Sequence, residues 1–284
     1  QLYEKLDGSL DKTNIHRYLD DFQNLMQIQN HLLYRNLISK YDLKNKKLLE
    51  IGSGSGAHSS VIKRLGANLI ACDITFDRCF STEKKLNLIE NDFNHLTINA
   101  SAENLPIKNE TFDYIYSNGV LHHADDTNKC IDEIYRVLKK NGKAVIMLYC
   151  RQSAEYYFNI LPKAIVTGSI FRYKDESNWV GVVTEGKSKF FETKNPITRV
   201  YNKSEILTLF KKFKLVSLEK AYFSYKDFAI PRLTQTREAV LKFFGNKPHP
   251  GGQVVYGNPV VPLTKLEKKL GKFFGFFWYI TVSK

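Results

Sequence analysis

Residues 48–56 read Leu48-Leu49-Glu50-Ile51-Gly52-Ser53-Gly54-Ser55-Gly56, and this stretch decides the fold. A short apolar run that stops at glycines is typical of a buried parallel strand. Glycine lets the backbone turn sharply and lets a ligand approach the main chain. The next residues, Ala57 to Leu65, have helical periodicity, and Gly66 provides a C-terminal cap. The stretch therefore predicts a strand, a glycine turn and a helix whose N-terminus faces a ligand.

The alternation of strands and helices continues on both sides of this turn. Residues 14–39 are predicted as one helix, and helices are also predicted at residues 77–87 and 127–138. Further strands are predicted at residues 69–72, 112–116 and 143–149, with Asn141-Gly142 as a turn before the last of these, and residues 92–98 are predicted as a helix end that runs into a short strand. The pattern predicts an α/β fold with a doubly wound, seven-stranded, mostly parallel sheet of the Rossmann-like kind.

The chain after residue 150 has a different pattern. Residues 151–200 are aromatic and interrupted by glycine and proline, and they predict an irregular segment. Two basic amphipathic helices are predicted within residues 231–274, and Phe276 to Val282 is predicted as the closing strand. We therefore divide the chain into an N-terminal helical cap (1–44), a cofactor-binding core (45–150) and the rest of the sheet with lid or acceptor-binding insertions (151–284).

The composition limits the classes of partner. Lys and Arg number 42 against 29 acidic residues, for a net charge of +13, which suits nucleic acid, an anionic membrane or an acidic small molecule. Because the lysines are spread along the chain, the pattern favours an ordinary solvated surface. The start of the chain lacks a signal-peptide pattern, and no apolar run reaches membrane-spanning length. The cysteines lack CxxC pairs and the histidines lack metal-ligand spacing, so we predict reduced thiols, a cytoplasmic protein and no metal; the cysteines are Cys72, Cys79, Cys130 and Cys150.

Asp73 ends the strand that follows the glycine turn, 17 residues beyond Gly56. A carboxylate in this position can accept hydrogen bonds from the ribose hydroxyls of an adenosine cofactor. A dinucleotide site competes with this interpretation, but it prefers G-x-G-x-x-G, and here the third glycine comes one residue early.

Four ordered segments together resemble the class I methyltransferases. Residues 48–56 resemble motif I of that family, and the later motifs are matched by residues 100–106, 112–123 and 133–142. The resemblance covers about residues 45–150 and is closest to the branch with quinone-biosynthesis, sterol and sugar-modifying enzymes. Two positions depart from the family pattern: Ser101 stands where Asp is frequent, and Asn141 where Pro is common.

The resemblance implies S-adenosylmethionine as the cofactor. It implies that Glu50, Gly52 and Gly54 line the methionine part and that Asp73 holds the ribose. Ser101 and Ala102 would face the adenine edge, and Ser117 and Asn118 would lie under the sulfonium and its methyl group. The implied cofactor set is completed by Ser53, Gly56, Ile74 and Glu103.

Candidate catalytic residues follow the fourth and fifth strands of the core. His122 or His123 would serve as the general base for a hydroxyl acceptor, because histidine titrates near neutral pH. The alternative is that one packs beneath the cofactor and the other is a solvated loop residue. Tyr149 and Arg151 would orient an acidic or phosphorylated acceptor, unless Arg151 only pairs with a nearby carboxylate. Residues 184–187 and 195–201 resemble the lid of methyltransferases from polysaccharide and secondary-metabolite pathways.

The sequence thus predicts methyl transfer to a small-molecule acceptor, at a hydroxyl oxygen of sugar or secondary-metabolite type. One alternative is a lipid or quinone methyltransferase at a membrane surface, which the basic surface and the aromatic residues 273–280 would serve. Another is a non-catalytic module that binds cofactor or a partner. A nucleic-acid methyltransferase is disfavoured, because the amino-methylating DNA enzymes carry (N/D)-P-P-(Y/F) where this chain has Ser117-Asn118-Gly119-Val120.

Overall fold

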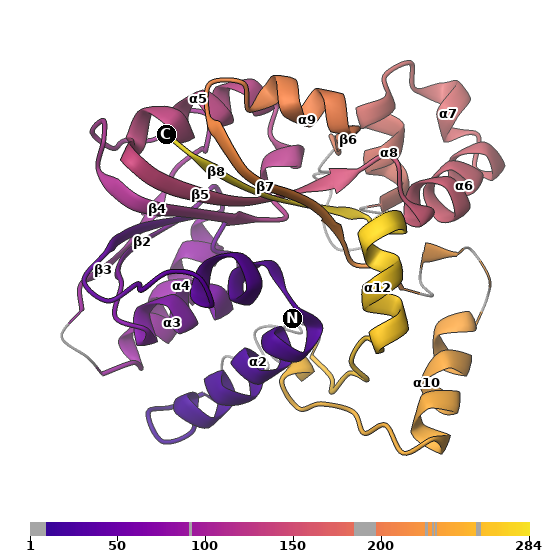
Figure 1. Cartoon of the computed structure of the whole chain (residues 1–284), viewed down its shortest axis with the longest axis horizontal. Coiled ribbons are helices and arrows are strands. Elements are labelled where there is room, and N and C mark those ends of the chain that lie inside the picture. Colours follow the sequence, from indigo (N-terminus) through magenta and orange to yellow (C-terminus); the bar gives the residue numbers. More distant parts are fainter. Residues whose placement is uncertain are drawn as a thin grey trace.

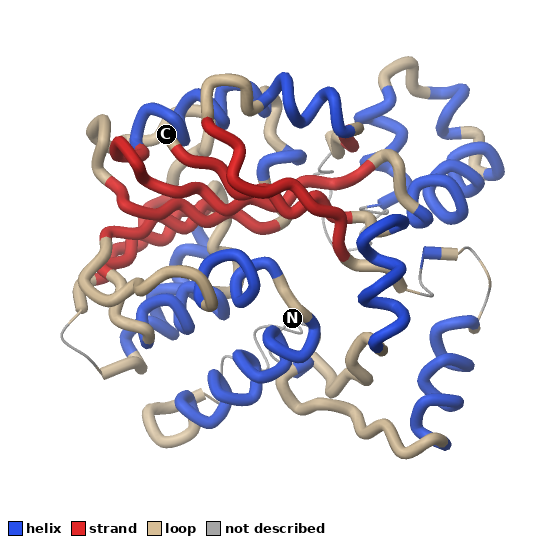
Figure 2. Tube along the Cα trace, viewed as in Figure 1, coloured by secondary structure: helices blue, strands red, loops and turns tan. Residues whose placement is uncertain are grey.

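A central sheet lies between two layers of helices (Figures 1 and 2). The computed structural model describes residues 10–90, 93–184, 197–224, 227–228, 230, 232–253 and 257–284. Within these residues the sheet has the strand order β3-β2-β1-β4-β5-β8-β7, and the short strand β6 pairs with β5. The doubly wound, mostly parallel sheet predicted from the sequence is confirmed, with β6 as an additional strand.

The parallel half of the sheet holds strands β1 to β5, each paired in parallel with its neighbours in that half. Its strands are β1 (Lys47–Ile51), β2 (Asn68–Asp73), β3 (His95–Asn99), β4 (Phe112–Asn118) and β5 (Leu138–Cys150). Its connecting helices are α3 (Ala57–Arg64), α4 (Phe76–Asn87), η2 (Leu121–His123) and α5 (Thr127–Val137). The predicted glycine turn, Asp73 and Asn118 all lie where these strands end, at the carboxyl edge of the sheet.

The antiparallel half closes the sheet. Strand β8 (Phe277–Ser283) pairs with β5 on one side and with β7 (Lys214–Ala221) on the other, both antiparallel. The aromatic residues at its start therefore belong to the sheet, as favoured above over a membrane anchor, and Trp278 and Ile280 are buried. Strand β6 (Val200–Tyr201) is followed by α9 (Lys203–Leu209), which begins with a capping box formed by Asn202 and Glu205.

Two boundaries in the core differ from the prediction. The fourth strand extends through Ser117 and Asn118, so these residues end the strand instead of following it. The predicted turn at Asn141-Gly142 lies inside β5, where Asn141 has φ 63° and the register to β4 shifts. The two residues form an irregularity in a 13-residue strand because Asn tolerates the left-handed conformation without ending the ladder.

The N-terminal helix predicted over residues 14–39 is broken. Helix α2 (Ile15–Gln29) ends at Asn30, which adopts φ 56°, and a short π-helix, η1 (Leu33–Ile38), follows. The Asn30 and His31 amides donate to Gln27 O and Met26 O and so satisfy carbonyls at the end of α2. Periodicity could not show this break because both segments bury the same kinds of apolar side chains against the sheet.

The region predicted as irregular after residue 150 is largely helical. It contains η3 (Tyr156–Ile160), α6 (Leu161–Val166), α7 (Ser169–Arg172) and α8 (Glu176–Thr184), and these elements pack around their own apolar cluster. Residues 185–187 and 195–196 of the two predicted lid motifs lie outside the described residues. The two predicted basic helices are confirmed as α10 (Leu233–Phe243) and α12 (Lys265–Phe274).

Two apolar cores fill the space between the sheet and its helices. One lies under α2, η1 and α3, and the other lies under α5 and α9 on the opposite face. All four cysteines are free and buried. Among the described residues, every helix is too short or too polar to cross a bilayer.

Candidate functional site

The three glycines of the turn after β1 all have positive φ, at 80° for Gly52, 56° for Gly54 and 79° for Gly56. A Cβ on Gly52 would lie 2.1 Å from Val120, and a Cβ on Gly56 would lie 2.8 Å from the Cα of Thr82. A Cβ on Gly54 would meet nothing within 4 Å. Gly52 and Gly56 are therefore required for close packing, whereas Gly54 leaves its backbone open to a ligand.

Asp73 lies directly beside this open glycine. Its Oδ2 accepts a hydrogen bond from the Gly54 amide at 2.9 Å, and its Oδ1 accepts one from Thr75 N, also at 2.9 Å. The neighbouring Ile74 is 73% exposed, which leaves an apolar side chain next to the carboxylate. Ser53 is buried in the turn, and its Oγ accepts from the Thr82 hydroxyl at 3.1 Å.

The residues predicted near adenine follow β3 in a partly buried turn. The Ser101 hydroxyl accepts the Glu103 amide at 3.2 Å, and Glu103 Oε1 accepts the Asp126 amide at 2.9 Å. These contacts fix Ala102 in the turn after β3, at the same edge of the sheet as Asp73. The Glu103 carboxylate thus connects this turn to the N-terminus of α5.

Ser117 and Asn118 differ in their accessibility. Ser117 is fully buried and its hydroxyl donates to Ile51 O at 3.0 Å, which ties β4 to β1. Asn118 lines a cavity of about 290 Å³ at the carboxyl edge of the sheet. Of these two predicted residues, only Asn118 has its side chain at an open space.

Glu50 is buried beneath the turn, and burial raises the pKa of its carboxyl group to about 8. The Ser59 hydroxyl donates to its Oε2, and His58 Nδ1 lies 3.9 Å from its Oε1. The carboxylate is therefore bound on one side by α3 and faces an imidazole on the other.

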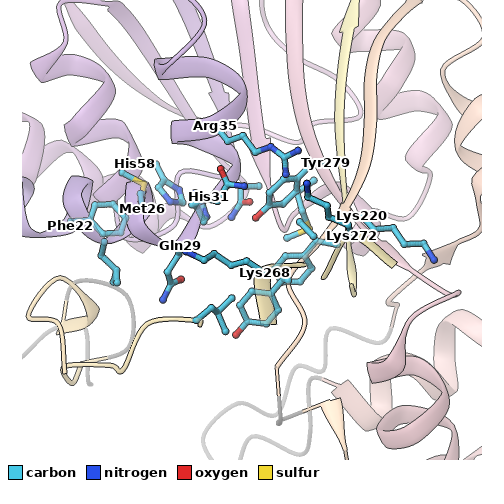
Figure 3. Close-up of a pocket in the computed structure, with 18 residues that line it drawn as sticks. Phe22, Met26, Gln29, His31, Arg35, His58, Lys220, Lys268, Lys272 and Tyr279 are labelled. Atoms are coloured by element: carbon cyan, nitrogen blue, oxygen red, sulfur yellow. The ribbon is translucent and has the colours of Figure 1, made fainter. Parts of the chain in front are cut away.

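The cavity is enclosed by α2, η1, α3, α12 and the ends of β4, β5, β7 and β8 (Figure 3). Among the described residues, its lining contains four cationic side chains and no carboxylate; the cations are Arg35, Lys220, Lys268 and Lys272. Figure 3 shows His31 and His58 on the side of the N-terminal helices, with Lys220 and Lys272 on the opposite side. The aromatic rings of Phe22, Phe277 and Tyr279 complete the walls.

His31 and His58 were not among the predicted site residues. Burial lowers the pKa of His31 to about 4 and that of His58 well below its usual value, so both rings are neutral. His58 is the second residue of α3, directly after the glycine turn, and its place at a ligand-facing helix N-terminus is a signal the sequence did contain. His31 offers no such signal, because only the break at Asn30 directs it to the cavity.

The predicted bases His122 and His123 lie apart from this cavity lining. His122 is fully buried, and neither ring nitrogen has a hydrogen-bond partner among the residues that the structure describes. Its ring packs on Tyr149, with centroids 3.8 Å apart, and on His123 at 4.2 Å. His123 Nδ1 lies 3.2 Å from Ile197 O, where it donates to that carbonyl. His122, His123 and Tyr149 thus form an aromatic stack that continues to Phe276.

Arg151 is held by carboxylates, which favours the alternative stated for it above. Its guanidinium pairs with Glu176 at 2.5 Å and with Glu205 at 3.0 Å, and it also donates to Val200 O at 3.2 Å. Arg151 therefore joins β5 to α8, β6 and α9.

Comparisons with known proteins agree with this geometry. A family model described as a methyltransferase domain matches residues 49–146. The ubiquinone/menaquinone biosynthesis C-methyltransferase UbiE of Rickettsia bellii is 30% identical over 177 residues, which cover 55% of this chain and 70% of the relative.

Solved structures share the fold. A SAM-dependent methyltransferase from Methanosarcina mazei is 15% identical, with a TM-score of 0.57, and the match covers 87% of this chain and 96% of the other. An S-adenosylmethionine-dependent methyltransferase from Mesorhizobium loti is 11% identical, with a TM-score of 0.53 and coverage of 90% and 100%. The protein is an enzyme whose cofactor is S-adenosylmethionine, and the chain belongs to the class I S-adenosylmethionine-dependent methyltransferases.

Proposed function

We propose that the enzyme transfers the methyl group to a hydroxyl oxygen of a small acceptor that carries an anionic group, and that the acceptor binds in the cavity beside Asn118. One observation carries the proposal: in the part of the chain that the structure describes, four cationic side chains and no carboxylate line a cavity at the carboxyl edge of the sheet, where such folds bind ligands.

The residues around the glycine turn fit the cofactor. The open backbone at Gly54 and the Asp73 carboxylate suit an adenosine ribose, and Ile74 offers an apolar surface for the base. When bound, the cofactor supplies a methyl group activated by its sulfonium. The chain then needs only to align the nucleophile and exclude water. Asn118 is our candidate for the contact between the two sites, because it ends β4 and lines the cavity.

The four cations differ in the ion pairs and hydrogen bonds that they already make within the protein. Arg35 pairs with Glu219, Lys220 donates to Gln152 O and Phe273 O, and Lys268 donates to Ile28 O. Lys272 has no ion pair or hydrogen bond with any residue that the structure describes. We therefore assign Lys272 as the principal contact for a carboxylate or phosphate on the acceptor.

The test is a transfer assay with methyl-labelled S-adenosylmethionine. The acceptors are a panel of hydroxylated carboxylates and phosphate esters and a matched panel of uncharged alcohols. We expect label in the anionic panel only. Equal labelling of both panels, or none in either, would contradict the proposal.

Two variants of α12 sharpen this test. Lys272→Met should raise KM for an anionic acceptor about 10-fold, since a hydrogen bond to a charged group contributes about 1.5–3 kcal/mol. Lys265→Met, exposed on the same helix but outside the cavity lining, should leave KM unchanged. If KM does not change in Lys272→Met, this lysine does not contact the acceptor.

A second candidate is methylation of a ring carbon. The Rickettsia bellii relative is named a C-methyltransferase of ubiquinone and menaquinone biosynthesis. Loss of a phenolic proton also activates the neighbouring ring carbon, so the same cavity would serve both reactions. Proton–carbon NMR of the labelled product distinguishes a methoxy group from a methyl group on carbon.

A further inference from the structure

Two imidazoles share one wall of the acceptor cavity. His31 follows the helix break at Asn30, His58 lies in the first turn of α3, and their ring centroids are 5.1 Å apart. Glu50 and Tyr116 both face His58 from the neighbouring strands, and the charge of Asp73 acts on Glu50. The two rings differ in the groups that face their Nδ1 atoms.

His31 is arranged as a hydrogen-bond donor. The Leu33 amide donates to its Nδ1 at 3.3 Å, so Nδ1 is the unprotonated nitrogen. A neutral imidazole then carries its proton on Nε2. His31 can therefore donate a hydrogen bond to an acceptor oxygen, but it has no lone pair left to receive a proton.

His58 has the opposite arrangement. Its Nδ1 faces Glu50 Oε1 at 3.9 Å, and the Ser59 hydroxyl fixes that carboxyl group from the other side. The ring stacks on Phe22, with centroids 5.5 Å apart, and meets the edge of Tyr116 at 5.6 Å. A proton on Nδ1 that points to Glu50 leaves the lone pair on Nε2, and a carboxylate behind an imidazole orients a base in this way.

We propose that His58, positioned by Glu50, is the catalytic base that receives the proton of the acceptor hydroxyl. The inference rests on the proposed function. The O–H bond breaks and its proton goes to Nε2, while the oxygen forms a bond to the methyl carbon. The S–CH₃ bond breaks and its electron pair stays on sulfur, which leaves a neutral thioether and an imidazolium.

The charge balance explains why a buried carboxylate belongs here. The reaction moves one positive charge from the sulfonium to His58, and Glu50 lies next to the imidazole that gains it. In the empty site, burial disfavours charge on both Glu50 and His58. A cation bound nearby stabilises the carboxylate, which in turn stabilises the imidazolium.

The first experiment needs no acceptor. Long-range proton–nitrogen spectra of the ¹⁵N-histidine-labelled protein, saturated with S-adenosylhomocysteine, report the tautomer of each ring. His58 should be neutral with its proton on Nδ1, and His31 neutral with its proton on Nε2. Signals are assigned by their loss in His58→Gln and His31→Gln. A proton on Nε2 of His58, or a charged ring at pH 7, overturns the inference.

The second experiment uses an acceptor found by the labelling screen. His58→Gln should lower kcat at least about 100-fold, as expected for loss of a general base, with the dissociation constant of S-adenosylhomocysteine changed less than twofold. Added imidazole should restore part of the turnover of His58→Gly, which a structural role would not allow. His16→Gln, exposed on α2, is the control and should keep wild-type kcat.

The inference is overturned if kcat is unchanged in His58→Gln. It is also overturned if kcat falls in His122→Gln but not in His58→Gln. If the screen yields no methylated product, the proposed function fails instead. The tautomer measurement then decides the assignment of His58 by itself.

Discussion

Asp73 and Gly54 form the smallest unit of the proposed cofactor site. The carboxylate accepts from two backbone amides on its own protein, and those bonds hold it beside the one glycine of the turn that is open to a ligand. The position of the carboxylate is set by the end of β2 and by the glycine turn together, so this contact needs both residues.

Asp73→Ala should weaken binding of S-adenosylhomocysteine about 30-fold, since the lost hydrogen bonds to a carboxylate correspond to about 2 kcal/mol. Isothermal titration calorimetry measures this change. Asp77→Asn, exposed in the first turn of α4, removes the same charge nearby and should bind normally. Equal weakening in both variants would indicate a general effect of charge.

Glu50 makes the stability of the empty protein depend on pH. Burial raises its folded pKa from 4.5 to about 8, so the stabilising contribution is complete below pH 4.5 and is lost as the pH rises through 8. Glu50→Gln should therefore raise the free energy of unfolding at pH 9 by about 2 kcal/mol, or roughly 4 °C in Tm, with a smaller difference at pH 6. Thermal unfolding of the cofactor-free proteins tests this, and a variant that is less stable at pH 9 would contradict it.

At the scale of elements, Arg151 connects three segments that follow one another in the chain. It directly follows β5, and its side chain binds Glu176 at the start of α8, Glu205 in α9 and the carbonyl of Val200 in β6. Tyr156 of η3 donates to the same Glu176 at 2.5 Å. This guanidinium thus joins η3 and α8 to the sheet, in addition to their apolar packing.

Arg151→Met should reduce the free energy of unfolding by about 1–2 kcal/mol, because the pair is only partly shielded from water. Hydrogen exchange should increase in α8 before it increases in β5. Lys212→Met removes an ion pair to Asp132 whose side chains are both more than half exposed, and it should change neither quantity. Exchange in α8 that stays at the wild-type rate would show that this ion-pair cluster does not hold α8 to the sheet.

Features set by residues close together in the chain could be predicted from the sequence, whereas features set by packing could not. The glycine turn and Asp73 lie within a short strand–turn–helix–strand segment, and their spacing alone located them. The contact between His31 and His58 joins two separate helices, and it depends on a left-handed residue at Asn30 that periodicity does not reveal. His122 and His123 were predicted as candidate bases because they follow β4, and in the structure their rings are part of an aromatic stack.

At the scale of the molecule, β8 joins the parallel and antiparallel halves of the sheet. It hydrogen-bonds to β5 and β7 along its whole length, and its side chains contribute to the cores on both faces. The sequence predicts this strand as part of the sheet, but its position between β5 and β7 follows only from the three-dimensional pairing.

Ile280→Ala, in the fully buried middle of β8, should reduce the free energy of unfolding by roughly 3 kcal/mol. Urea unfolding followed by circular dichroism and by tryptophan fluorescence should give one shared transition, since Trp278 lies in the same strand. Phe273→Ala, at a side chain that is 64% exposed, is the control and should be nearly neutral. Separate transitions by the two probes would show that the halves unfold independently.

The central place of β8 also sets the order in which the chain can assemble on a ribosome. Lys143 in β5 pairs with Ser283, 140 residues further along the chain. The core with the glycine turn and Asp73 can form early in synthesis, but one edge of β5 stays exposed until β8 has been made. Such an edge pairs readily with other strands, so the nascent protein passes through a period in which it is prone to association.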